Sequence, residues 1–136
     1  MTGERERGSL TVEAVVLAPV LVMVLLAAVF VHRYTEASYR LTRVADVAAR
    51  TASQVQFDSM SAHGAIAARR ELAATYPACS GASVRLSTRT EAGLLHVTAT
   101  VRCDVDMGGL ALLGVGRRTV TATSTEVVDF HTNRGA

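Results

Sequence analysis

Residues 8–31 read GSLTVEAVVLAPVLVMVLLAAVFV, and this stretch decides how the rest of the chain is organised. No charged side chain occurs between positions 14 and 31. As a helix, this run is roughly 27 Å long, close to the thickness of the hydrocarbon core of a bilayer. We therefore predict a transmembrane helix over residues 9–31, in which Glu13 is the only interruption of the apolar sequence.

Three interpretations of this helix are open. A cleaved secretory signal peptide has a shorter apolar core, of about 7–15 residues, and a small-residue cleavage site. Here Leu26 stands where a small residue is expected before Ala27 and Ala28. A plain signal anchor explains the length but not Glu13, because a carboxylate costs roughly 2.5–3.5 kcal/mol at mid-membrane. A helix that is retained after cleavage upstream of it explains both features.

The residues before the apolar run favour this third interpretation. A short charged leader ends in Gly8, four residues follow, and Glu13 then precedes the long apolar helix. This arrangement resembles the class III signal of type IV pilin-like proteins. More closely, R-G-S-x-T-V-E followed by V-L-A-P-V-L resembles the TadE-like minor pilins of the tight-adherence pilus apparatus.

The resemblance implies a cleavage site and a subunit contact. A prepilin peptidase would cut between Gly8 and Ser9 on the cytoplasmic side, which makes Ser9 the first residue of the mature chain and Glu13 its fifth. In a filament, the Ser9 ammonium of one subunit can then neutralise Glu13 of a neighbour and select the axial register. The alternative is that Glu13 only reaches towards the polar interface of the membrane.

The resemblance also implies a function and partners. It predicts a minor pilin or pseudopilin incorporated in a tight-adherence type pilus or secretion assembly; adhesion, secretion and DNA uptake all stay open as the role of that assembly. The expected partners are a prepilin peptidase, other pilin subunits, the assembly platform with its ATPase, and membrane lipid. The alternative function is an uncleaved bitopic membrane protein with an extracytoplasmic binding head. Flanking charges do not decide the topology, so we place the C-terminal part outside the cytoplasm from the resemblance and the cysteines.

Downstream of the membrane, the pattern predicts two helices. No Gly or Pro occurs between Val20 and Ala62, so the first helix can continue as a spine. Three-four spacing predicts one apolar stripe along it, and Glu36–Arg40 and Arg43–Asp46 are expected to pair. A second helix is predicted over residues 59–75, begun by Asp58 and Ser59. Its predicted apolar side comprises Ala62, Ile66, Ala73 and Tyr76.

After Pro77 the pattern becomes alternating, which predicts an antiparallel sheet of three strands. The loop at 91–93 joins the first two strands, and a Thr-rich third strand is expected over about 117–129. The apolar loop 107–116 is interpreted either as part of the core or as an interface. The fold class is therefore α+β, with a transmembrane helix continuing into a helical spine that packs on a small sheet head.

These segments give the predicted domain organisation. It comprises a leader peptide (1–8), the transmembrane helix (9–31), the helical spine and second helix (32–78), the sheet head (79–130) and a disordered tail (131–136).

The two cysteines, Cys79 and Cys103, suit a disulfide. The link closes a loop of about 25 residues and would stabilise a small Val- and Ala-based core by roughly 3 kcal/mol. Two unrelated buried thiols in a cytosolic domain are the alternative, and the membrane anchor favours the disulfide.

Other functions are not indicated by the sequence. The net charge is only +2, so no nucleic-acid partner is expected. The four histidines are scattered, the cysteines form no ligand motif, and no nucleophile elbow or phosphate loop occurs. We therefore expect no metal, no cofactor and no enzymatic activity.

Overall fold

The computed structural model describes residues 5–108, 114 and 116–128, with side chains from Val12 onward. By their internal contacts, the residues form two units, Met1–Arg33 and Tyr34–Ala136. Along the chain, the elements are α1 (Arg5–Ser53), the 3-10 turn η1 (Phe57–Ser59), α2 (Met60–Thr75), β1 (Ser80–Glu91), β2 (Leu94–Asp106) and β3 (Arg117–Val127). The fold class is α+β, as the sequence predicts.

In the first unit, the part of α1 that contains the apolar run leaves its large side chains exposed. Val12, Leu21 and Leu25 are each more than 60% exposed, although their side chains are wholly apolar. Pro19 lies inside this helix. Water does not favour such a surface, so this helix needs another environment around it.

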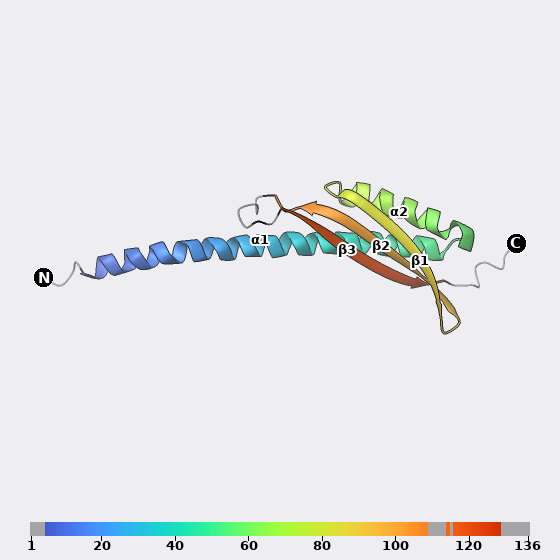
Figure 1. The fold of residues 1–136 in the computed structure, drawn as a ribbon, viewed down its shortest axis with the longest axis horizontal. Helices are drawn as coiled ribbons and strands as arrows, with labels where there is room; N and C mark the ends of the chain where they lie inside the picture. The colour runs from blue at the N-terminus through green and yellow to red at the C-terminus, as the bar shows by residue number, and fades with distance from the viewer. Residues whose placement is uncertain (1–4, 109–113, 115, 129–136) are drawn as a thin grey trace. The chain divides into compact units, whose positions relative to one another are not determined.

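In the second unit, the three strands form an antiparallel sheet in the order β1-β2-β3 (Figure 1). The predicted hairpin is confirmed: Glu91 ends β1, Leu94 begins β2, and the two residues between them have positive φ angles, 50° at Ala92 and 80° at Gly93. Such a pair matches a type I′ turn, whose twist suits adjacent antiparallel strands. The predicted three-stranded meander is therefore present.

One face of the sheet packs on the C-terminal part of α1. In β2 the odd-numbered residues from Val97 to Val105 are buried and the even-numbered ones lie on the other face, because strand side chains alternate. The helix contributes a buried stripe with helical spacing. The stripe comprises Ala37, Leu41, Val44, Ala45, Ala48, Ala49 and Ala52. The stripe predicted from the sequence was Ala37, Leu41, Val44, Ala45, Ala48, Ala52 and Val55. Ala49 is an addition to it, and Val55 lies beyond the end of α1, where it is half-buried.

The second helix buries a different face from the predicted one. Its buried residues are Met60, Gly64, Ala68 and Leu72, whereas the predicted Ala62, Ile66 and Ala73 are exposed and Tyr76 is half-buried. The physical reason is close approach. A Cβ at Gly64 would lie 3.0 Å from the Ala48 carbonyl oxygen and 3.1 Å from the Ala52 Cβ, and would meet Leu86. Gly64, the smallest residue of α2, therefore faces α1 and β1.

The start of α2 also differs in detail from the prediction. The helix begins at Met60, and Ser59 occupies its N-cap position without a side-chain capping bond. The Ser59 hydroxyl instead donates to the Gln56 carbonyl oxygen over 3.0 Å, within the turn that precedes the helix.

The loop that joins β2 to β3 is described only at its ends. Met107 is fully buried, and its amide donates to the Gly116 carbonyl oxygen over 3.0 Å. Residues 109–113 and 115 of the apolar loop lie outside the described residues, and so does the tail at 131–136 that was predicted to be disordered.

Candidate functional site

The predicted cleavage site lies at the start of α1. Gly8 and Ser9 have helical backbone, in the first turns of a helix that begins at Arg5. Glu13 follows Ser9 by four residues, a separation of about 6 Å along the helix axis. Its side chain is exposed. The carboxylate therefore stands where the apolar run begins, more than two turns inside α1 as the structure describes it.

The apolar part of α1 has the length of a membrane span. Among the described residues, one helix is long and apolar enough to cross a membrane: Val12–Ser53, whose most apolar 18-residue stretch is entirely unburied. A buried core helix of a globular protein would have neighbours along this stretch. An exposed helix of this composition is instead typical of one that lies in lipid.

The two cysteines form the disulfide that the sequence predicts. Cys79 and Cys103 are joined at an S–S distance of 2.05 Å, with their Cα atoms 5.6 Å apart. Cys103 is buried in β2, and Cys79 lies in the turn between α2 and β1. The bond therefore fixes the chain just beyond the end of α2 to the central strand of the sheet.

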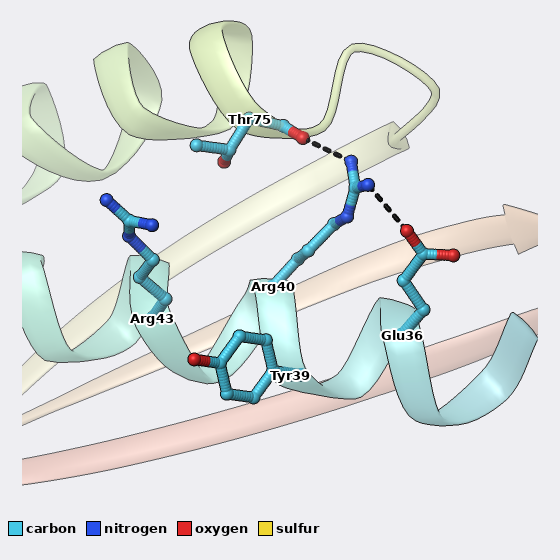
Figure 2. Close-up of a pocket in the computed structure, with 5 residues that line it drawn as sticks. All are labelled: Glu36, Tyr39, Arg40, Arg43 and Thr75. Carbon is cyan, nitrogen blue, oxygen red and sulfur yellow. Dashed lines mark hydrogen bonds and ion pairs between the residues drawn. The ribbon is translucent and has the colours of Figure 1, made fainter. Parts of the chain in front are cut away.

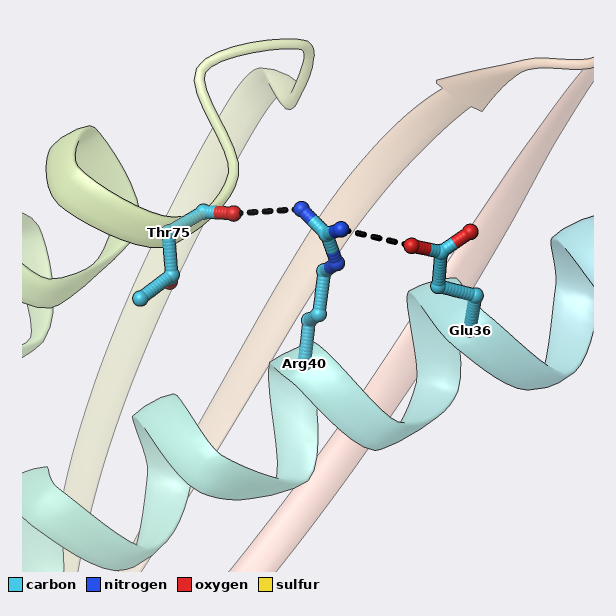
Figure 3. Close-up of polar contacts among 3 residues, drawn as sticks. All are labelled: Glu36, Arg40 and Thr75. Carbon is cyan, nitrogen blue, oxygen red and sulfur yellow. Dashed lines mark hydrogen bonds and ion pairs between the residues drawn. The ribbon is translucent and has the colours of Figure 1, made fainter.

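A polar junction joins the same end of α2 to α1. From α1, Arg40 donates to the backbone carbonyl oxygen of Thr75 over 2.7 Å and to Glu36 Oε1 over 2.5 Å (Figure 3). Thr75 is the last residue of α2, and the last carbonyl groups of a helix have no partner within it. The guanidinium therefore caps α2 at its negative end. The Glu36–Arg40 pair was predicted from the sequence, but the contact with Thr75 was not.

Tyr76 lies directly beneath this cation. The guanidinium carbon of Arg40 is 5.6 Å from the centroid of the Tyr76 ring, within range of a cation–π interaction. Burial raises the pKa of Tyr76 above its ordinary value of 10.0, the charge of Arg40 acts in the opposite direction, and Glu36 adds to the rise. Tyr39 and Arg43 border the shallow pocket beside Arg40 (Figure 2).

The predicted pair of Arg43 with Asp46 is wrong. Arg43 Nε lies 3.3 Å from Glu71 Oε1 on α2, and Asp46 Oδ1 accepts a hydrogen bond of 2.7 Å from the Ser124 hydroxyl on β3. Each residue thus reaches another element instead of its neighbour along α1. Helical spacing identifies neighbours along one helix, but it carries no information about groups that the fold brings in from elsewhere.

The part of the chain that the structure describes contains no cluster of three or more His, Cys, Asp or Glu side chains suited to a metal ion. Its polar contacts instead link α1 to α2 and α1 to the sheet, through Arg40, Arg43 and Asp46. These contacts position elements of the head.

The fold and these contacts define a class of protein: a chain with an N-terminal apolar helix fit for a membrane and a small, disulfide-linked α+β head. Comparison with known families agrees with this class, because the model of the TadE-like protein family matches residues 8–50. The match includes Gly8, Ser9, Glu13 and the whole apolar run, and it agrees with the resemblance noted in the sequence. No curated protein and no solved structure matches the chain.

The family match covers residues 8–50 of the 136 residues, so the likeness to TadE-like proteins concerns the N-terminal helix of this chain. By length and composition, the apolar part of that helix is suited to anchor the chain in a membrane.

Proposed function

We propose that this chain is a minor pilin or pseudopilin, cleaved by a prepilin peptidase between Gly8 and Ser9 and then incorporated in a tight-adherence type pilus or secretion assembly. The single observation that supports this most is the family match, which begins at Gly8 and runs through the apolar helix. In this proposal the leader is lost and the helix from Ser9 onward stays attached to the head.

Glu13 has a defined role in the proposal. Cleavage creates a new ammonium group on Ser9, and a neighbouring subunit can offer this group to the Glu13 carboxylate. An isolated carboxylate near lipid is costly, whereas a neutralised pair is much less so. The exposed position of Glu13 on α1 is compatible with such an intermolecular contact. A subunit that is out of axial register would leave both charges unpaired.

The proposal places the head outside the cytoplasm. The disulfide between Cys79 and Cys103 supports this placement, because such bonds persist in oxidising compartments and are rare in the cytosol. The proposed partners are the prepilin peptidase, other pilin subunits, the assembly platform with its ATPase, and membrane lipid.

Co-expression with an active prepilin peptidase tests the cleavage. We expect a mature protein whose N-terminal residue is Ser9, identified by N-terminal sequencing or intact mass. The Gly8→Val variant should remain uncleaved, because a branched side chain would occupy the space where the peptidase approaches the backbone. Gly3→Val is the matched control, since it makes the same change five residues upstream and should be processed normally.

Persistence of the full-length wild-type chain beside an active peptidase would contradict the proposal. That outcome would favour the alternative function, an uncleaved bitopic membrane protein with a binding head.

A further inference from the structure

The face of the sheet that points away from α1 has an unusual composition, and we call it the outer face. Its central part comprises Ser83, Arg85, Ser87 and Arg89 on β1, His96, Thr98, Thr100 and Arg102 on β2, and Thr121, Thr123 and Thr125 on β3. By the same register, the ends of the face carry Glu91, Leu94, Asp104, Asp106, Arg117, Thr119 and Val127. The three arginines of the central part are exposed. None of the three strands contains Phe, Tyr or Trp. The central part of the outer face therefore combines three arginines with a dense array of hydroxyl groups.

The register brings two of these arginines together. Arg85 lies opposite Thr100, and Arg102 lies opposite Ser83, so the two arginines are diagonal neighbours on adjacent strands. Diagonal neighbours of this kind have Cβ atoms about 7–8 Å apart, within reach of a shared ligand for side chains as long as arginine. The four residues Ser83, Arg85, Thr100 and Arg102 line a shallow pocket on this face.

The charge of this pocket is only partly balanced, because one carboxylate, Asp104, follows Arg102 by two residues on the same face of β2. Within the described part of the chain, the ion pairs involve Arg40 and Arg43, and no carboxylate pairs with Arg85, Arg89 or Arg102. Asp104 lies at one end of the same face, where its Oδ1 accepts a hydrogen bond of 2.6 Å from the Thr119 hydroxyl. Two neighbouring cations on a sheet repel one another, so an anion between them would be favourable.

We propose that the outer face binds an acidic polysaccharide, with Arg85 and Arg102 holding one of its carboxylate groups. A guanidinium presents paired N–H donors that match the two oxygens of a carboxylate. Thr and Ser hydroxyls can both donate and accept hydrogen bonds, which suits a ligand that carries hydroxyl groups beside its acids. Two cross-strand pairs of threonines, Thr98–Thr125 and Thr100–Thr123, extend this surface onto β3.

The composition of the outer face argues against a nucleic acid as the occupant. Proteins that hold single strands stack the bases on aromatic side chains, and this face has none. The proposal relies on the extracytoplasmic position of the head given under the proposed function, but it does not rely on cleavage at Gly8.

Binding of the purified, full-length, uncleaved chain in detergent to immobilised polygalacturonate tests the proposal. We expect saturable binding that weakens with added salt, and no binding to neutral dextran. Replacing both arginines (Arg85→Gln with Arg102→Gln) should weaken the affinity at least ~10-fold, because two charge-assisted contacts are lost.

The matched control is Arg69→Gln with Arg70→Gln. These arginines are also exposed but lie on α2, so the variant loses the same two charges from another surface. Its affinity should stay within about twofold of the wild type, since distant exposed charges are screened. Thr100→Val removes one hydroxyl from the pocket without a change of charge, and we expect about a threefold loss from it.

Three outcomes would overturn the proposal. Equal losses in the two double variants would show a general effect of charge, and equally tight binding of duplex DNA would show an unspecific polyanion surface. No measurable binding of polygalacturonate by a chain whose disulfide is intact would also overturn it. Because all measurements use the uncleaved chain, they are independent of whether a prepilin peptidase processes Gly8.

Discussion

Glu13 carries one negative charge at the start of an apolar helix, and its proposed partner is an amine on another copy of the chain. We predict that Glu13→Ala leaves membrane insertion intact, because it removes a charge from the apolar segment. Incorporation into the pilus assembly should fall by about tenfold or more, since the Ser9 ammonium of the neighbour would then be left unpaired. Immunoblots of sheared filament fractions and membrane fractions measure the two quantities separately.

The control is Glu91→Ala, which removes the same charge from the exposed end of β1. It should be incorporated like the wild type. Equal incorporation of Glu13→Ala and wild type would refute the proposed pairing.

Substitution of Gly64 should change the stability of the head, because α1 and β1 approach this residue closely. Alanine at this position gains about 1 kcal/mol in helix propensity but adds a methyl group where a Cβ lies 3.0 Å from the Ala48 carbonyl oxygen. Overpacking of this kind costs about 1–3 kcal/mol. We expect Gly64→Ala to destabilise the head by about 1 kcal/mol and Gly64→Val to cost about 3 kcal/mol.

Hydrogen exchange of the β2 amides under increasing urea measures the stability of the head in the detergent-solubilised chain. Ala62→Val on the exposed side of α2 is the control, and it should change the stability by less than about 0.5 kcal/mol. A Gly64→Val variant as stable as this control would mean that α2 does not pack closely at Gly64.

At the scale of elements, α2 is held at its C-terminal end by Arg40. Arg40→Gln removes the charge that caps the Thr75 carbonyl, and we expect a loss of about 1–2 kcal/mol after allowance for the partial exposure of this side chain. Arg43→Gln loses the same charge from a side chain that is 66% exposed. It should therefore cost less than about 0.5 kcal/mol. Equal losses in the two variants would contradict the capping role.

Arg40→Gln should also change the pKa of Tyr76, which can be followed by absorbance. The chain has three tyrosines, so Tyr34→Phe with Tyr39→Phe leaves Tyr76 as the only one. In that background its absorbance should titrate above pH 10.0, and Arg40→Gln should raise the midpoint further, because Arg40 lowers this pKa. Because the pKa of Tyr76 is higher in the folded than in the unfolded state, the neutral Tyr76 side chain makes its full contribution to stability below pH 10.0. It is then lost as the pH rises through the folded-state value.

The strands were the most predictable elements. Alternation of apolar and polar residues identifies the buried side of β2 directly, because strand side chains point to opposite faces in turn. The same alternation places Cys103 on the buried side of β2. The turn at Ala92 and Gly93 was recognisable because glycine adopts positive φ without strain.

The buried face of α2 was not predictable in the same way. Alanines occur on all sides of this helix, so apolar periodicity barely distinguishes one face from another. The close approach of α1 at Gly64 decides the face, and that approach exists only in the folded chain. The contact of Arg40 with Thr75 was not predictable either, because the two residues are 35 positions apart and only the fold brings them together.

At the scale of the whole molecule, the disulfide is the only covalent link between distant parts of the described chain. Cys79 and Cys103 are separated by 24 positions, and a loop of this size corresponds to about 3 kcal/mol of stabilisation. We predict that Cys79→Ala with Cys103→Ala lowers the free energy of unfolding of the head by this amount. The urea midpoint, measured with and without reductant, checks the prediction.

Reductant should lower the midpoint of the wild type and leave that of the double variant unchanged. Mass spectrometry of the unreduced wild-type chain should find the two cysteine peptides linked. Identical midpoints in all four samples would refute a stabilising role for the bond.

The hydrogen bond from Ser124 to Asp46 joins residues 78 positions apart, and β3 closes the sheet beside β2. The buried stripe of α1, from Ala37 to Ala52, is therefore synthesised long before the strands that cover it. During biosynthesis this stripe stays partly uncovered until β3 has left the ribosome. Contacts between such distant positions form slowly, so the nascent chain passes through a stage in which apolar surface is exposed and aggregation is favoured.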